Sequence, residues 1–103
     1  MGCYEGLSNS RKGEIAELEC ALWLMKNGYE VYRNVAKTGQ VDLVTRKSGK
    51  ITLIDVKADC VDKRVGYRTY KHSRSKSQAK QGIKILRFNP DTKVVRFVKH
   101  RLK

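Results

Sequence analysis

The chain has 103 residues, of which 40% are hydrophobic, enough for one small core and a single domain over residues 1–103. Its 23 Lys and Arg residues outnumber 10 Asp and Glu residues, and the net charge of +13 predicts a polyanionic partner, nucleic acid before a membrane surface. The sequence lacks a long apolar span, a basic amphipathic helix and a secretory signal, so neither membrane attachment nor export is expected. Three scattered cysteines without a Cys-x-x-Cys pair indicate reduced thiols in the cytoplasm.

A helix is predicted from Gly13 to about residue 28. Its apolar residues recur at spacings of three and four and form one helical face: Ile15, Leu18, Leu22 and Met25. Serines and an asparagine at residues 8–10 offer N-cap oxygens, and Gly28 is a natural stop. Glu17 lies at the edge of the apolar face, from which it could reach over a sheet. The alternative is a solvated glutamate that favours the helix N-terminus.

Two strands joined by a tight turn are predicted next, after a strand over residues 30–35 and a turn over residues 36–39. The dipeptide Ser48-Gly49 favours a hairpin turn, and residues 50–57 form the central strand. Residues two apart in a strand share a face, so Asp55 and Lys57 project together while the residues between them face the core. Asp42 interrupts the apolar run before the turn, and an acid in such a place usually has a partner or a metal.

This ribbon could bring Asp42, Asp55 and Lys57 to one side. Two carboxylates can hold a hard divalent cation, and a neighbouring lysine can handle a proton or a developing anion. The three side chains therefore indicate a phosphodiester-cleaving site. Taken alone, an acid followed two residues later by a lysine is as typical of a solvated strand.

The rest of the chain completes one α/β domain: a short polar helix over residues 73–81, a strand over 83–88, a turn over 89–92 and a strand over 93–98. The order of helix, three strands, helix and two strands predicts a mixed sheet flanked by helices.

The segment from residue 58 to residue 80 is strongly basic, and its lack of an apolar pattern predicts a loop that is mobile without DNA. Its cations are expected to contact phosphates: Lys63, Arg64, Arg68, Lys71, Arg74, Lys76 and Lys80. Tyr67 and Tyr70 lie among them and could stack on unpaired bases. The alternative is a solvated loop whose charges contact nothing specific.

Three motifs in order resemble the PD-(D/E)xK nuclease superfamily: a helix with Gly-x-x-Ala-Glu at residues 13–17, the apolar-flanked Asp42, and the acid-x-Lys of Asp55 and Lys57. The small size and the helix opening are most similar to archaeal-type and phage Holliday junction resolvases. Two departures are visible, because Val41 stands where the family has proline and Asp55 where many members have glutamate.

The resemblance implies a restriction-endonuclease-like core and a magnesium-dependent DNA endonuclease, in which Mn²⁺ could substitute for Mg²⁺. By the resemblance, Asp42, Asp55 and the Val56 carbonyl would bind the metal, and Glu17 would complete the site directly or through water. Lys57 would orient or activate the attacking water or stabilise the pentacovalent phosphate.

The resemblance also implies that Gln78 lies near the scissile phosphate, although a glutamine on a short helix is usually solvated. A four-way junction has two scissile strands related by a two-fold axis, so a homodimer is expected, with Trp23 and Phe97 as candidates for its apolar interface. Other nucleases of the superfamily, of the repair, nicking or restriction type, are alternatives. So is a non-catalytic nucleic-acid-binding module on the same fold.

Overall fold

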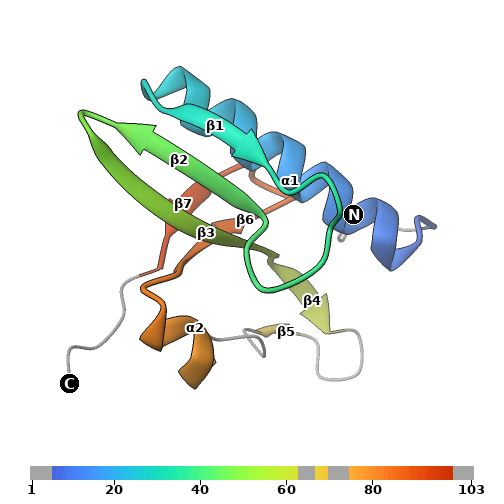
Figure 1. Ribbon diagram of the computed structural model, residues 1–103. Coiled ribbons are helices and arrows are strands. Elements are labelled where there is room, and N and C mark those ends of the chain that lie inside the picture. Colours follow the sequence, from blue (N-terminus) through green and yellow to red (C-terminus); the bar gives the residue numbers. More distant parts are fainter. Residues whose placement is uncertain (1–5, 63–66, 70–74, 99–103) are drawn as a thin grey trace.

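The computed structural model describes residues 6–62, 67–69 and 75–98. One helix, α1, covers a five-stranded sheet with strand order β1-β2-β3-β6-β7 (Figure 1). The predicted α/β class, a mixed sheet flanked by helices, is confirmed. The elements of this core are α1 (Asn9–Lys26), β1 (Glu30–Arg33), β2 (Leu43–Lys47), β3 (Lys50–Ala58), β6 (Lys84–Phe88) and β7 (Val95–Phe97). Within the described ranges, no helix combines the length and hydropathy of a membrane span.

Helix α1 begins at Asn9, four residues before the predicted start. Ser8 is its N-cap, and the Ser8 hydroxyl accepts a hydrogen bond from the Arg11 N–H at 3.2 Å, which satisfies one of the free amides of the first turn. The helix ends at the expected place, where Asn27 is the C-cap and Gly28 takes a φ of 88°. A residue with a side chain would be strained in that conformation.

The face of α1 that packs on the sheet differs from the predicted one. Its buried residues are small except for one leucine: Ala16, Cys20, Ala21 and Leu24. The predicted apolar face points to solvent instead, with 48% of Leu18, 43% of Leu22 and 55% of Met25 exposed. Small side chains let the helix approach the sheet closely, and the large residues remain outside.

Trp23 and Phe97, the predicted candidates for a subunit interface, contact each other within the chain. Their ring centroids lie 6.0 Å apart at an interplanar angle of 68°, an edge-to-face arrangement. Both rings are partly buried against the core cluster beneath α1.

The sheet is antiparallel except at its centre, where β3 and β6 run parallel. Ile54 and Val56 of β3 lie on the α1 side with Leu86 and Phe88 of β6. The opposite side carries the residues of intervening parity, so Asp55 and Lys57 lie on the face that α1 does not cover.

The basic segment after β3 contains two short strands, so the prediction of an irregular loop was wrong. Strands β4 (Cys60–Asp62) and β5 (Tyr67–Thr69) pair in antiparallel fashion as a separate two-stranded sheet, and β4 lies beyond the end of β3 (Figure 1). The short helix α2 (Lys76–Lys80) follows, with Ser75 as its N-cap and Gln81 as its C-cap.

Candidate functional site

The β2–β3 hairpin places Asp42 beside Asp55, as the sequence predicts. Ser48 and Gly49 form the turn with φ values of 51° and 79°, the positive angles of a tight hairpin turn. The resulting register pairs Leu43 with Ile54, so Asp42 lies just beyond the last pair of the ladder, and its side chain is close enough to Asp55 for that carboxyl to affect the pKa of Asp42. The Asp42 N–H donates to the Ile54 carbonyl at 2.8 Å, which fixes the Asp42 backbone at the end of the ladder.

The Asp42 side chain lies at the strand end and is only partly accessible to solvent. Its Oδ2 accepts a hydrogen bond from the Val56 N–H at 2.7 Å. Burial, as the largest cause, and the neighbouring Asp55 carboxyl together raise the pKa of Asp42 to about 6, with a smaller contribution from the charge of Glu17 and against the opposing effect of the Val56 N–H. A carboxyl group whose pKa is raised beside a second carboxylate is typical of a site that binds a cation or handles protons.

Asp55 and Lys57 form an ion pair on the face of β3 that α1 leaves uncovered. Lys57 Nζ lies 3.2 Å from Asp55 Oδ2, outside hydrogen-bond geometry, and within the described residues no hydrogen-bond donor reaches this buried oxygen. A carboxylate oxygen that has an ion pair but no hydrogen bond, beside a second carboxylate, suits a hard divalent cation, which prefers oxygen ligands. The residues present therefore fit a magnesium ion at Asp42 and Asp55.

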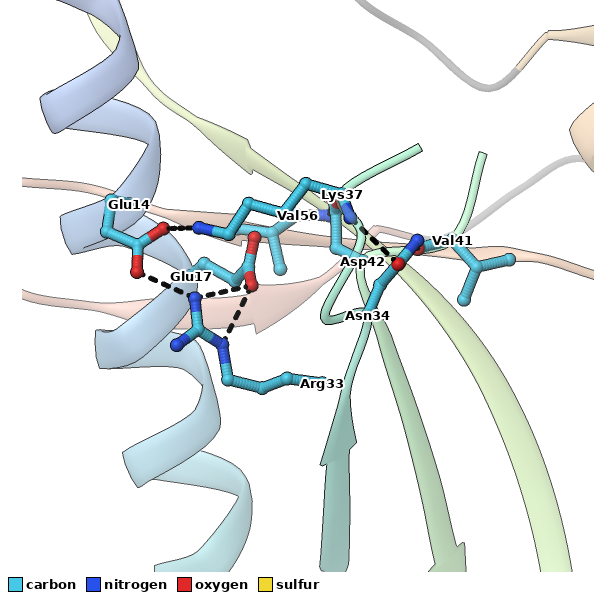
Figure 2. Close-up of polar contacts among 8 residues, drawn as sticks. All are labelled: Glu14, Glu17, Arg33, Asn34, Lys37, Val41, Asp42 and Val56. Atoms are coloured by element: carbon cyan, nitrogen blue, oxygen red, sulfur yellow. Dashed lines mark hydrogen bonds and ion pairs between the residues drawn. The ribbon is translucent and has the colours of Figure 1, made fainter. Parts of the chain in front are cut away.

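Glu17 reaches the same end of the sheet from α1, where Arg33 holds it. Arg33 Nε and Nη2 lie 3.0 and 2.9 Å from Glu17 Oε1, and Nη2 also lies 2.7 Å from Glu14 Oε2. Lys37 contacts Glu14 as well, so two cations face two carboxylates (Figure 2). These neighbours lower the pKa of Glu14, Lys37 more than Arg33. Sequence reasoning identified Glu17 but missed these partners.

Among the described residues, no three Asp, Glu, His or Cys side chains gather closely enough to form a ready metal cage. Glu17 Oε1 already accepts a hydrogen bond from Arg33. Asp42 and Asp55 lie side by side, and the roles of Asp42, Asp55 and Glu17 as metal ligands stay predictions. Magnesium commonly keeps several waters and takes one or two carboxylates, so two acids are compatible with it.

Hydrogen bonds to the Asn34 side chain hold the loop before Asp42. The Asn34 side-chain amide donates to the carbonyls of Thr38 and Val41 at 2.6 and 2.9 Å, and its oxygen accepts from the Lys37 N–H at 3.0 Å. Figure 2 shows Asn34 beside Val41 and Asp42. A single asparagine thereby orders the turn that delivers Asp42 to the sheet.

Helix α2 lies against the other side of this loop through Gln78. The Gln78 Oε1 accepts from the Ser75 N–H at 3.0 Å as part of a capping box, and its Nε2 lies 3.4 Å from the Gln40 carbonyl. Gln81 and Ser77 add hydrogen bonds to the Gln40 side chain. The buried Gln78 therefore connects α2 to the Asp42 loop, and its catalytic role stays a prediction.

Of the seven residues predicted to contact DNA, the structure describes the side chains of two. Lys76 and Lys80 are exposed on α2, the helix that touches the Asp42 loop. Arg68 lies in β5. The other four predicted contacts lie outside the described residues: Lys63, Arg64, Lys71 and Arg74.

A buried ion pair that sequence reasoning missed lies farther along β3. Arg87 Nη1 lies 3.0 Å from Asp59 Oδ1, and the two side chains are only 6% and 5% exposed. The Asp59 N–H also donates to the Phe88 carbonyl at 2.8 Å. The residues are 28 positions apart and meet because β3 and β6 are parallel neighbours, which no local sequence signal indicates.

Comparison with known proteins supports the fold. No family model matches the chain. It is 38% identical over 61 residues to UPF0102 protein Atu0303 of Agrobacterium fabrum, an alignment that covers 52% of this chain and 50% of the relative. The chain thus spans about half the length of the curated relative that it matches.

A solved structure resembles the whole described core. The bacterial homing endonuclease I-Ssp6803I matches with a TM-score of 0.74 at 17% sequence identity, over 89% of this chain and 69% of that chain. At this identity the likeness concerns the fold. The chain therefore has the α/β restriction-endonuclease-like core that its motifs predict.

Proposed function

We propose that this chain is a metal-dependent endonuclease that hydrolyses phosphodiester bonds in DNA. The observation that carries the proposal is the cluster of Asp42, Asp55 and Lys57 at one end of the central hairpin, with a buried carboxylate oxygen that has no hydrogen-bond donor among the described residues. The likeness to a homing endonuclease supports this assignment, because the cluster lies on a scaffold shared with a DNA-cleaving protein. The net charge of +13 suits a phosphate backbone as partner.

Asp42 and Asp55 would hold magnesium, with the Val56 carbonyl and Glu17 as further ligands. When bound, such an ion lowers the pKa of a ligated water and neutralises charge on the phosphate. Asp42 needs its negative charge for this role. Because its pKa lies at about 6, metal affinity and cleavage should both fall as the pH drops below that value.

Lys57 is held in the site by its ion pair with Asp55. In the proposed reaction Asp55 would help to hold the metal, and Lys57 would turn to the attacking water or to the charge on the phosphate. A cation placed where negative charge develops stabilises the transition state more than the ground state. Gln78, anchored between α2 and the Asp42 loop, keeps these elements in register near the scissile phosphate.

The preferred substrate in this proposal is a four-way DNA junction, cut by a homodimer. The substrate assignment depends on the resemblance of the Gly-x-x-Ala-Glu helix opening to junction resolvases, and the dimer on the two-fold symmetry of a junction. Lys76 and Lys80 on α2, together with the basic segment before it, would contact the backbone.

Cleavage of a substrate panel tests the proposal. Linear duplex, single strand, flap, fork and four-way junction are incubated with Mg²⁺, Mn²⁺, Ca²⁺ or a chelator, using the full chain and the variants Asp42→Asn and Asp55→Asn. We expect cleavage with Mg²⁺ and Mn²⁺, binding without cleavage in Ca²⁺, and no cleavage by either variant. The exposed acid Asp91 provides a matched control, Asp91→Asn, which should cut normally.

The outcomes separate the coarse proposal from the finer one. Full activity in Asp42→Asn or Asp55→Asn would refute the site assignment. Equal cleavage of duplex and junction by a monomer would refute the resolvase assignment and leave a general nuclease. Tight DNA binding without cleavage of any substrate would favour the non-catalytic binding module.

A further inference from the structure

Charges alternate along the side of β3 that faces away from α1. Asp55, Lys57 and Asp59 follow one another at two-residue intervals, so they project on the same side as far as the ladder continues. It continues to Asp59, whose N–H bonds to the Phe88 carbonyl. The parallel register pairs Lys57 with Arg87. Arg87 is therefore a second cation directly beside Lys57, and along the strand direction it lies between Asp55 and Asp59.

Arg87 is equally placed to pair with either acid. Arg87 is paired with Lys57, and Asp55 and Asp59 each lie two residues from Lys57, or about 7 Å along the strand. This distance is within the span of a long side chain. A guanidinium stays protonated in proteins and strongly favours a carboxylate when buried. In the structure Arg87 binds Asp59 at 3.0 Å, and Lys57 binds Asp55 at 3.2 Å. The two cations are thereby divided between the two acids.

We propose that Asp59 is a positioning residue that keeps the Arg87 guanidinium away from Asp55. This inference rests on the proposed role of Asp55 as a metal ligand. A buried guanidinium on Asp55 would occupy the oxygen that has no hydrogen-bond donor among the described residues and would compete with a metal for it. Lys57, with a side chain 29% exposed, is a weaker competitor, because its ammonium can move into solvent.

The first test is the metal-free crystal structure of Asp59→Asn. We expect the Arg87 guanidinium to have turned to Asp55 and to bind its carboxylate. A structure in which Arg87 stays away from Asp55 would overturn the proposal. This readout requires neither metal nor DNA, so it holds whether or not the chain is a nuclease.

The second test is calcium affinity measured by calorimetry, without DNA. Substitutions around metal ligands typically cost about 10–100-fold in affinity, and we expect a loss in that range for Asp59→Asn. The double variant Asp59→Asn/Arg87→Gln should regain the affinity of the unmodified protein, because the competing cation is gone. If Asp59 served stability alone, the double variant, which also lacks the ion pair, would bind calcium no better than the single variant.

Two controls keep the inference separate from the proposed function. Asp55→Asn should abolish calcium binding; if the unmodified protein binds no calcium, the proposed metal site fails, whereas the crystal structure still decides where Arg87 turns. If the Asp59→Asn variant does not fold, the proposal is tested instead by side-chain NMR of the unmodified protein. During a calcium titration the Lys57 ammonium resonance should shift and the Arg87 guanidinium resonance should not. Equal shifts of both would overturn the proposal.

Discussion

Replacing Asp42 by asparagine should stabilise the metal-free protein at neutral pH while removing its response to metal. The pKa of Asp42 is raised from 3.8 to about 6 by burial first and by Asp55 second. One pKa unit corresponds to about 1.4 kcal/mol, so ionisation of Asp42 costs the native state at most about 3 kcal/mol. Solvent screening of a half-buried group reduces this to about 1–2 kcal/mol. Asparagine has the same shape, and its Oδ1 can still accept from the Val56 N–H.

The sign of the pH dependence follows from the raised pKa. The native state binds the Asp42 proton more tightly than the unfolded chain does, so this group's contribution to stability is fully present below pH 3.8 and is lost as the pH rises through about 6. The gain from Asp42→Asn should therefore be absent near pH 4, grow as the pH rises toward 6, and be complete above pH 6. For a domain of this size it corresponds to a rise in Tm of about 5–10 °C, measured by scanning calorimetry in a chelator.

Calcium provides the second half of the assay. A ligand that binds only the native state at a hundredfold excess over its Kd stabilises it by about 2.7 kcal/mol, and Asp42→Asn should lose this shift. Asp91→Asn, at an exposed acid in the turn between β6 and β7, should change neither the Tm at neutral pH nor the calcium response. A lower Tm for Asp42→Asn at neutral pH, or an undiminished calcium shift, would refute the reasoning.

Three further predictions concern the rate, the core and the partner. Lys57→Ala should lower the single-turnover cleavage rate far more than DNA affinity; a large affinity loss at an unchanged rate would make Lys57 a simple phosphate contact. Leu24→Ala should cost about 2–5 kcal/mol in urea unfolding and Leu22→Ala at most about 1 kcal/mol, whereas equal losses would contradict the observed helix face. DNA affinity should fall steeply and linearly on a log–log plot against salt, and a flat plot would exclude a binding mode dominated by phosphates.

The hairpin could be predicted because its information is local. A strand repeats every two residues, and the positive φ values of Ser48 and Gly49 set the register across the turn. That register, together with alternation along β3, placed Asp42, Asp55 and Lys57 together without knowledge of the rest of the fold. Lys57 and the two acids are separated by at most 15 positions, and the turn between them leaves little freedom.

The buried face of α1 could not be predicted in this way. Hydrophobic periodicity shows where large apolar side chains recur, and it gave Leu18 and Leu22 more weight than Ala16 or Cys20. A helix lying on a sheet is limited by how closely the two backbones approach, and small residues permit that approach. Cys20 lies on the observed face, and burial raises the pKa of its thiol to about 12.

Contacts that depend on the parallel pairing of β3 with β6 could not be predicted from the sequence either. The crossover between these strands contains β4, β5 and α2, and no turn motif fixes the register at its end. The ion pair of Asp59 with Arg87 exists because that register is as observed. Two short strands in a polar, basic segment leave no apolar alternation to detect, so β4 and β5 were predicted as loop.

Glu17 lies near Asp42 although the predicted helix face was wrong, and its position bears on how a chain of positive net charge would bind a cation. Glu17 follows the buried Ala16, so it flanks the face that packs on the sheet and points toward the end of the hairpin. There it joins Asp42 and Asp55, while Lys57 and Arg33 supply the neighbouring positive charges. With Glu14 and Lys37 included, the four carboxylates exceed the three cations by one in a chain of net charge +13. In the proposed function a divalent ion would be attracted to that small negative region, and the net positive charge of the chain would attract the phosphate backbone.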